Sequence, residues 1–123
     1  MGKNGATILL IEDELLLCWS LEEALKPCGY ATVIATTGHA GLAAIEGPGR
    51  YDAVVTNIRL SDGPDGWTLA RRARELHPDV AVIYVSGDSA VDHTAEGVPD
   101  SVMISKPLKA GQIQAELQRL LKH

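Results

Sequence analysis

Apolar residues along this chain gather in short continuous runs, and between these runs they recur every three or four positions. Continuous apolar runs are typical of strands buried on both faces, whereas the wider spacing is typical of amphipathic helices. The pattern predicts strands at 6–12, 30–36, 51–57, 80–86 and 101–105. It predicts helices at 14–27, 37–46, 67–77 and 109–122, and a weak, short helix at 88–96.

The same pattern indicates helix ends and faces. Pro27 and Gly29 end the first helix, because proline cannot continue the helix and glycine readily takes the left-handed conformation after its last turn. In the helix at 67–77 the side chains predicted to face the core are Leu69, Ala73 and Leu76. The arginines predicted to lie on its solvated face are Arg71, Arg72 and Arg74.

Strands and helices alternate along the whole chain with short connections. This order implies an α/β fold, in which a parallel sheet is covered by helices on both faces. No repeat, low-complexity segment or linker divides the chain, so we expect a single domain over residues 1–123 with no output domain. In such sheets the ligand site lies beyond the carboxyl ends of the strands.

Polar side chains stand where four of the predicted strands end. They are Glu12 and Asp13 after the first strand, Asn57 after the third, Ser86 after the fourth and Lys106 after the fifth. Adjacent carboxylates are hard oxygen donors that suit Mg²⁺ held largely through water. Asn57 would add a carbonyl oxygen for the metal, Ser86 a hydrogen bond to a phosphoryl oxygen, and Lys106 a positive charge.

Each of these features alone has an ordinary structural explanation. An acidic pair after a strand suits a helix N-terminus, Ser86-Gly87 suits a turn, and Lys106-Pro107 suits a loop. Four such features at the ends of four strands, in chain order, are hard to attribute to chance. We also expect that Lys106-Pro107 is a cis peptide, because only X-Pro bonds adopt that form with any frequency.

Composition and charge narrow the classes of function. Apolar residues make up 46% of the chain and charged residues 22%, which is enough for a buried core, and the net charge of −5 argues against a nucleic-acid surface. No apolar run approaches the length of a membrane span, and the N-terminus lacks the pattern of a signal peptide. Cys18 and Cys28 form no CxxC motif and the histidines are scattered, so we expect free thiols in a reducing cytoplasm and no zinc site.

The motifs at the strand ends resemble those of bacterial response-regulator receiver domains, the phosphoacceptor domains of two-component signalling. The matching motifs, which span essentially the whole chain, are IEDE at 11–14, VVTNIRL at 54–60, PDGW at 64–67, YVSG at 84–87 and SKP at 105–107. The resemblance implies a flavodoxin-like (βα)₅ three-layer sandwich with strand order 2-1-3-4-5. It also implies a cytoplasmic protein whose partner is a histidine kinase or a phosphotransfer protein, with no direct contact to nucleic acid or membrane, and it leaves a homodimer open.

The resemblance further implies a role for each site residue. Mg²⁺ would be bound by Asp13, by Glu12 through water and by the main-chain carbonyl of Arg59. Residue 57 would accept the phosphoryl group in an in-line, metal-assisted transfer, assisted by Ser86 and Lys106. Receiver domains of this kind catalyse their own phosphorylation and dephosphorylation.

The acceptor position departs from the family pattern, because Asn57 stands where an aspartate is expected. A neutral amide is a very poor nucleophile, so we expect that this chain is not phosphorylated there and that Mg²⁺ binds more weakly. The nearby carboxylates Asp52, Asp62 and Asp65 are not obvious substitutes. Two explanations fit the sequence equally well. The chain is a natural receiver without an acceptor, or it is a chain in which the aspartate has been replaced.

Three further residues lie on the output face or beside the site. Met103 stands on the fifth strand where the family normally has a tyrosine or phenylalanine switch residue. Together with the weak helix at 88–96 it predicts an altered and mobile output face, although simple core packing is the alternative. Arg59 and Asp88 flank the site, and we expect a salt bridge between them over its mouth.

Two functions fit these observations. The first is a stand-alone receiver of a phosphorelay, which accepts a phosphoryl group at position 57 in its aspartate form and signals by protein contact. The second is a non-catalytic pseudo-receiver that docks on a kinase or another signalling partner. An α/β hydrolase or a nucleotide-binding enzyme is disfavoured, because the chain has neither a GxSxG nor a Walker sequence.

Overall fold

Five parallel strands form one sheet in the computed structural model, which describes residues 5–88 and 92–121. The strands are β1 (Thr7–Ile11), β2 (Ala31–Ala35), β3 (Ala53–Asn57), β4 (Ala81–Ser86) and β5 (Val102–Ser105). Their order is β2-β1-β3-β4-β5. The predicted α/β class and the strand order 2-1-3-4-5 are therefore confirmed, and each predicted strand exists within one or two residues of its expected ends.

The helices also follow the predicted order. They are α1 (Leu15–Leu25), α2 (Gly38–Glu46), α3 (Gly66–Leu76), α4 (His93–Glu96) and α5 (Ala110–Leu120). A short 3₁₀ helix, Lys26–Cys28, follows α1 and ends at Gly29, whose φ of 83° is left-handed as expected of a residue that terminates a helix. Residues 89–91 and 122, which belong to two of the predicted helices, lie outside the described residues.

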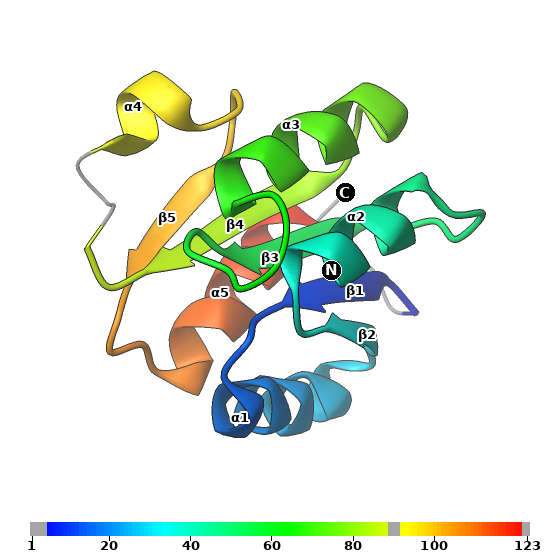
Figure 1. Cartoon of the computed structure of the whole chain (residues 1–123). Coiled ribbons are helices and arrows are strands. Elements are labelled where there is room, and N and C mark those ends of the chain that lie inside the picture. The colour runs from blue at the N-terminus through cyan, green and yellow to red at the C-terminus, as the bar shows by residue number, and fades with distance from the viewer. Residues whose placement is uncertain (1–4, 89–91, 122–123) are drawn as a thin grey trace.

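Two helical layers enclose the sheet. Figure 1 shows α1 and α5 on one face and α2 and α3 on the other, which is the predicted three-layer sandwich. The core on the first face includes Leu21, Leu25, Ile113 and Leu117, and the core on the second face includes Ile45 and Leu69. No helix within 5–88 and 92–121 combines the length and the apolar character that crossing a bilayer would require.

The register of the sheet brings the polar strand ends together. Ile11 pairs with Thr56, Asn57 pairs with Val85, and Ser86 pairs with Ser105. The residues that follow β1 and β5 therefore lie at the same edge as the last residues of β3 and β4. This edge is the carboxyl edge that the order of strands and helices predicts as the site.

One predicted core residue is not in the core. Leu76 was expected to face inward, but 42% of it is exposed, so this prediction is wrong. The residue lies in the last turn of α3, where the helix ends beside an open hollow that Leu76 lines. Leu69 and Ala73, which stand over the sheet, are fully buried as predicted.

Candidate functional site

Glu12 is the buried centre of the cluster at the carboxyl edge. Its Oε2 accepts hydrogen bonds from the backbone N–H of Glu14 at 3.1 Å and from Asn57 Nδ2 at 3.3 Å. Its Oε1 lies 3.3 Å from the ammonium of Lys106. Burial raises the pKa of the Glu12 carboxyl above its ordinary value, and this effect exceeds the opposing effects of the Glu14 N–H and of Lys106.

Asn57, the last residue of β3, is held by three hydrogen bonds. Its Nδ2 donates to Glu12 and also to the backbone carbonyl of Arg59 at 3.0 Å. Its Oδ1 accepts the backbone N–H of Ile58 at 3.1 Å. Only 9% of the residue is exposed, so the amide lies inside the site with each of its polar atoms paired.

The oxygens predicted to hold Mg²⁺ lie around this amide. The Glu12 carboxylate and the Arg59 carbonyl both accept from Asn57 Nδ2, whereas the exposed carboxylate of Asp13 accepts the backbone N–H of Ser61 at 3.3 Å. An N–H group thus stands where two of the predicted oxygen ligands converge, and this arrangement does not fit a bound cation. Across the described parts of the chain, no three His, Cys, Asp or Glu side chains are placed to hold a metal together.

Ser86 and Lys106 complete the cluster from β4 and β5. Ser86 is buried, and its Oγ accepts the backbone N–H of Asp88 at 3.2 Å. The backbone N–H of Lys106 donates to the carbonyl of Ser86 at 2.8 Å, which ties the end of β5 to the end of β4. The Lys106-Pro107 peptide is cis, as expected.

The salt bridge predicted beside the site is present. Arg59 Nε lies 3.1 Å from Asp88 Oδ1, with both side chains more than half exposed. Exposed pairs of this kind contribute little to stability because water and salt screen them. The pair nevertheless joins the segment after β3 to the segment after β4.

A buried tyrosine beside β5 was missed by the sequence reasoning. Tyr84 on β4 stands opposite the half-buried Met103 in the register, and its hydroxyl accepts the backbone N–H of Val98 at 3.1 Å. Its ring packs against Trp67, with centroids 4.6 Å apart, and edge-on to His93 at 5.7 Å. The aromatic group therefore anchors the connection from α4 to β5 by a hydrogen bond to its backbone.

Two arginines fix the same connection to α3. Arg71 pairs with the side chain and the backbone carbonyl of Glu96, and Arg74 donates to the carbonyls of Val80 and Pro99. The prediction that the arginines of this helix only cover a solvated face is therefore incomplete. These contacts attach Glu96 and Pro99 to α3, whereas the mobility of the output face stays a prediction.

An apolar surface on α1 also escaped the sequence reasoning. We call Leu15, Leu16 and Trp19 the α1 patch; their exposed fractions are 69%, 80% and 64%. Beside it a cavity of about 410 Å³ is lined by Glu14, Leu17, Lys106, Pro107 and Leu108. The sequence contained a signal, since three large apolar residues at helical spacing occupy the face opposite the buried Cys18 and Leu21.

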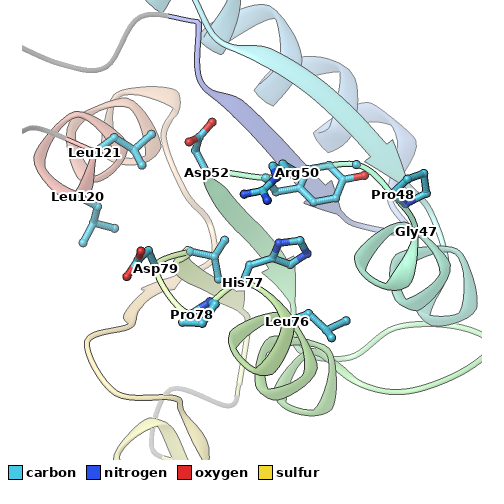
Figure 2. A pocket seen from close by; sticks show the side chains of 13 residues that line it. Gly47, Pro48, Arg50, Asp52, Leu76, His77, Pro78, Asp79, Leu120 and Leu121 are labelled. Atoms are coloured by element: carbon cyan, nitrogen blue, oxygen red, sulfur yellow. The ribbon is translucent and has the colours of Figure 1, made fainter.

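A second hollow lies at the opposite, amino edge of the sheet. Figure 2 shows Arg50, Asp52 and His77 around it, and its volume is about 690 Å³. Asp52 accepts the backbone N–H of Thr7 at 2.9 Å, at the far end of β3 from Asn57. Asp65 caps α3 by accepting the N–H of Thr68, so neither carboxylate is placed as a substitute acceptor.

The chain matches the family model of the response regulator receiver domain over residues 8–118. The receiver protein CpdR of Brucella abortus is 29% identical, over 93% of this chain and 95% of that protein. The sensor kinase CckA of Brucella abortus is 33% identical over 97% of this chain, but the match spans only 13% of the kinase. The chain likewise spans 28% of the length of the transcriptional regulatory protein ZraR of Salmonella typhimurium, at 25% identity over all of this chain.

Solved receiver structures share the fold over nearly the whole chain. A receiver protein from Sinorhizobium medicae is 35% identical and superposes with a TM-score of 0.91, over 95% of this chain and 94% of that one. The receiver domain of the sensor histidine kinase PA1611 from Pseudomonas aeruginosa is 26% identical with a TM-score of 0.82, over 97% and 99% of the two chains. That neighbour has a magnesium ion coordinated in its active site cleft.

Proposed function

This chain belongs to the response regulator receiver domain family of two-component signalling, and on that premise we propose that it is a stand-alone receiver that signals by protein contact without taking a phosphoryl group on residue 57. The observation that carries the proposal is the place of Asn57. Its side chain lies at the end of β3 within hydrogen-bonding distance of Glu12, in the cluster that Lys106 completes. The groups that the family resemblance assigns to phosphoryl transfer therefore lie around an amide, and this arrangement supports the proposal.

The chemical argument rests on the amide itself. Phosphoryl transfer needs an anionic oxygen that attacks phosphorus, and the oxygen of a neutral amide is a very poor nucleophile. Asn57 Oδ1 also accepts the backbone N–H of Ile58, so its electron density is already directed at a protein donor. Asp52 and Asp65 are held elsewhere by their own hydrogen bonds, so neither of these carboxylates is placed to take over the position.

A stand-alone role is supported by the likeness to the receiver protein CpdR, which this chain covers over 95% of its length. A histidine kinase or a phosphotransfer protein is the partner that we propose, by analogy with the family. The α1 patch offers an apolar docking surface beside the cavity that Lys106 lines. A protein bound there would lie next to the carboxyl edge of the sheet.

The alternative is a pseudo-receiver whose remaining site groups have also lost their chemical competence. The two versions of the proposal differ in what an aspartate at position 57 would do. In the first version the substitution Asn57→Asp restores phosphoryl transfer, because Ser86 and Lys106 are still placed at the strand ends. In the second version the aspartate remains inert.

The test is intact-mass measurement after incubation with MgCl₂ and acetyl phosphate. We expect no change for the unaltered chain and a gain of about 80 Da, one phosphoryl group, for Asn57→Asp. No gain on either protein would favour the pseudo-receiver. A gain on the unaltered chain, mapped to residue 57, would overturn the proposal that the amide blocks the chemistry.

A further inference from the structure

We propose that the amide group of Asn57 stands in for the cation of this site, so that the receiver keeps its site assembled without Mg²⁺. The two N–H bonds of Nδ2 are directed at Glu12 Oε2, at 3.3 Å, and at the Arg59 carbonyl, at 3.0 Å. The resemblance to receiver domains implies that both residues help to bind Mg²⁺, Glu12 through water and Arg59 through its main-chain carbonyl. The inference builds on the proposed function, because it concerns the same silent site, but it makes a separate claim about cation binding.

The orientation of the amide follows from its neighbours. Oδ1 faces an N–H donor, that of Ile58, and Nδ2 faces two acceptors. Turning the amide over would place Oδ1 against a carboxylate and a carbonyl, and would place Nδ2 against the Ile58 N–H. Three hydrogen bonds would become three repulsive contacts, so only the observed orientation satisfies the site.

Each charged group named in this site has a partner within the protein. The buried carboxylate of Glu12 faces the ammonium of Lys106 at 3.3 Å, and Asp13 is turned to the N–H of Ser61. Within the described residues, no buried side-chain nitrogen or oxygen lacks a hydrogen-bond partner. A cation entering between Glu12 and the Arg59 carbonyl must therefore displace two hydrogen bonds and meet the positive edge of an amide.

A simpler explanation would also weaken cation binding, namely the loss of one negative charge at position 57. The two explanations make different predictions for Asn57→Ala. Alanine and asparagine carry the same charge, so a charge deficit alone predicts equal affinity. If the amide occupies the cation position, removal of the amide frees the Glu12 and Arg59 oxygens, and alanine should bind the cation more tightly than asparagine does.

The experiment measures Mn²⁺ binding by the loss of its free electron paramagnetic resonance signal, for the unaltered chain, Asn57→Ala and Asn57→Asp. We expect the order Asp, then Ala, then Asn, with Ala at least about tenfold tighter than Asn. Circular dichroism of the three proteins controls for folding. Equal affinity of Asn and Ala, or tighter binding by Asn, would overturn the inference.

A second measurement needs no alanine variant. The side-chain NH₂ signals of Asn57 in a ¹⁵N correlation spectrum are identified by their absence in Asn57→Asp. We expect them to stay in place when about 10 mM MgCl₂ is added to the unaltered chain, because the amide keeps both acceptors. A titratable shift of these signals would show that the cation displaces the amide and would overturn the inference. Neither readout involves phosphoryl transfer, so a failure here leaves the proposed function standing, and the mass measurement tests that function separately.

Discussion

The ammonium of Lys106 lies 3.3 Å from the carboxylate of Glu12, and this contact joins the loop after β5 to the loop after β1. Glu12 is almost fully buried, whereas about a quarter of the Lys106 side chain is exposed. The Glu12 carboxylate depends on this contact more than Lys106 does, because burial disfavours its charged form and each of its oxygens needs a hydrogen-bond donor. In this chain Lys106 therefore has a structural role in addition to any chemical one.

Replacing Lys106 by methionine should destabilise the fold, because it leaves the buried Glu12 carboxylate without a counter-charge. We expect a loss of about 1–3 kcal/mol in the free energy of unfolding, measured by urea denaturation at pH 7. The control is Lys26→Met, since Lys26 pairs with Glu23 on the exposed surface and should matter much less. Equal effects of the two substitutions would contradict the structural role of Lys106.

Tyr84→Phe should cost about 1 kcal/mol at neutral pH, because the variant leaves the backbone N–H of Val98 without its acceptor. The cost should shrink above pH 10. Burial raises the pKa of Tyr84 above its ordinary value of 10.0, so in that range the folded state holds a proton that the unfolded state releases. The unaltered chain therefore loses stability as the pH rises through this range, whereas Tyr84→Phe has no phenol to ionise and does not lose this stability.

Urea unfolding of both proteins at pH 7 and at about pH 10.5 measures this difference. Tyr51→Phe is the matched control, because Tyr51 packs against His77 near the amino edge of the sheet and not against Val98. A difference between Tyr84 and its phenylalanine variant that grows with pH would mean that the hydroxyl ionises more readily when folded. That outcome would contradict the buried environment described for Tyr84.

Gly66→Ala should disrupt the start of α3. A Cβ on Gly66 would clash with the backbone carbonyl of Asn57. The two segments cannot easily move apart to relieve the clash, because the N–H of Gly66 donates to the carbonyl of Ile58. We expect a loss of more than about 2 kcal/mol in thermal or urea denaturation. Gly111→Ala is the control: its Cβ meets open space in α5, and helix propensity predicts a gain of up to about 1 kcal/mol. A mild effect at Gly66 would show that β3 and α3 can separate there.

Trp19→Ser should separate the two routes of phosphorylation in the Asn57→Asp background. Acetyl phosphate reaches the site by diffusion, so its labelling rate should stay the same. Transfer from the phosphorylated histidine domain of a kinase requires docking, and we expect it to slow by about tenfold or more if the α1 patch is the docking surface. Val33→Ser on β2, at 40% exposure, controls for the loss of an exposed apolar side chain. Unchanged kinase transfer would place docking elsewhere.

The sequence predicted the fold and the location of the site because both depend on patterns that are local to each segment. Apolar runs mark buried strands, and in a parallel sheet their carboxyl ends meet at one edge, so Glu12, Asn57 and Ser86 had to converge. The salt bridge between Arg59 and Asp88 followed from the same reasoning, since each residue stands two positions after a residue that ends a strand.

The finer features depend on contacts between segments that are distant in the sequence. Which end of the Asn57 amide faces Glu12 follows from the Ile58 N–H and the Arg59 carbonyl, and no pattern of residue types shows it. Leu76 has the helical spacing of a core residue, but α3 ends beside a hollow, so the side chain stays half exposed. The Tyr84 anchor likewise requires the exact path of the chain from α4 to β5.

The contacts of Tyr84 have a consequence for how a partner protein would recognise this chain. Its hydroxyl accepts the N–H of Val98 and its ring packs against Trp67 and His93, so these contacts tie α3, β4 and the connection from α4 to β5 together. A partner that distinguishes two conformations of this face must therefore bind one of them tightly enough to offset the loss of these contacts.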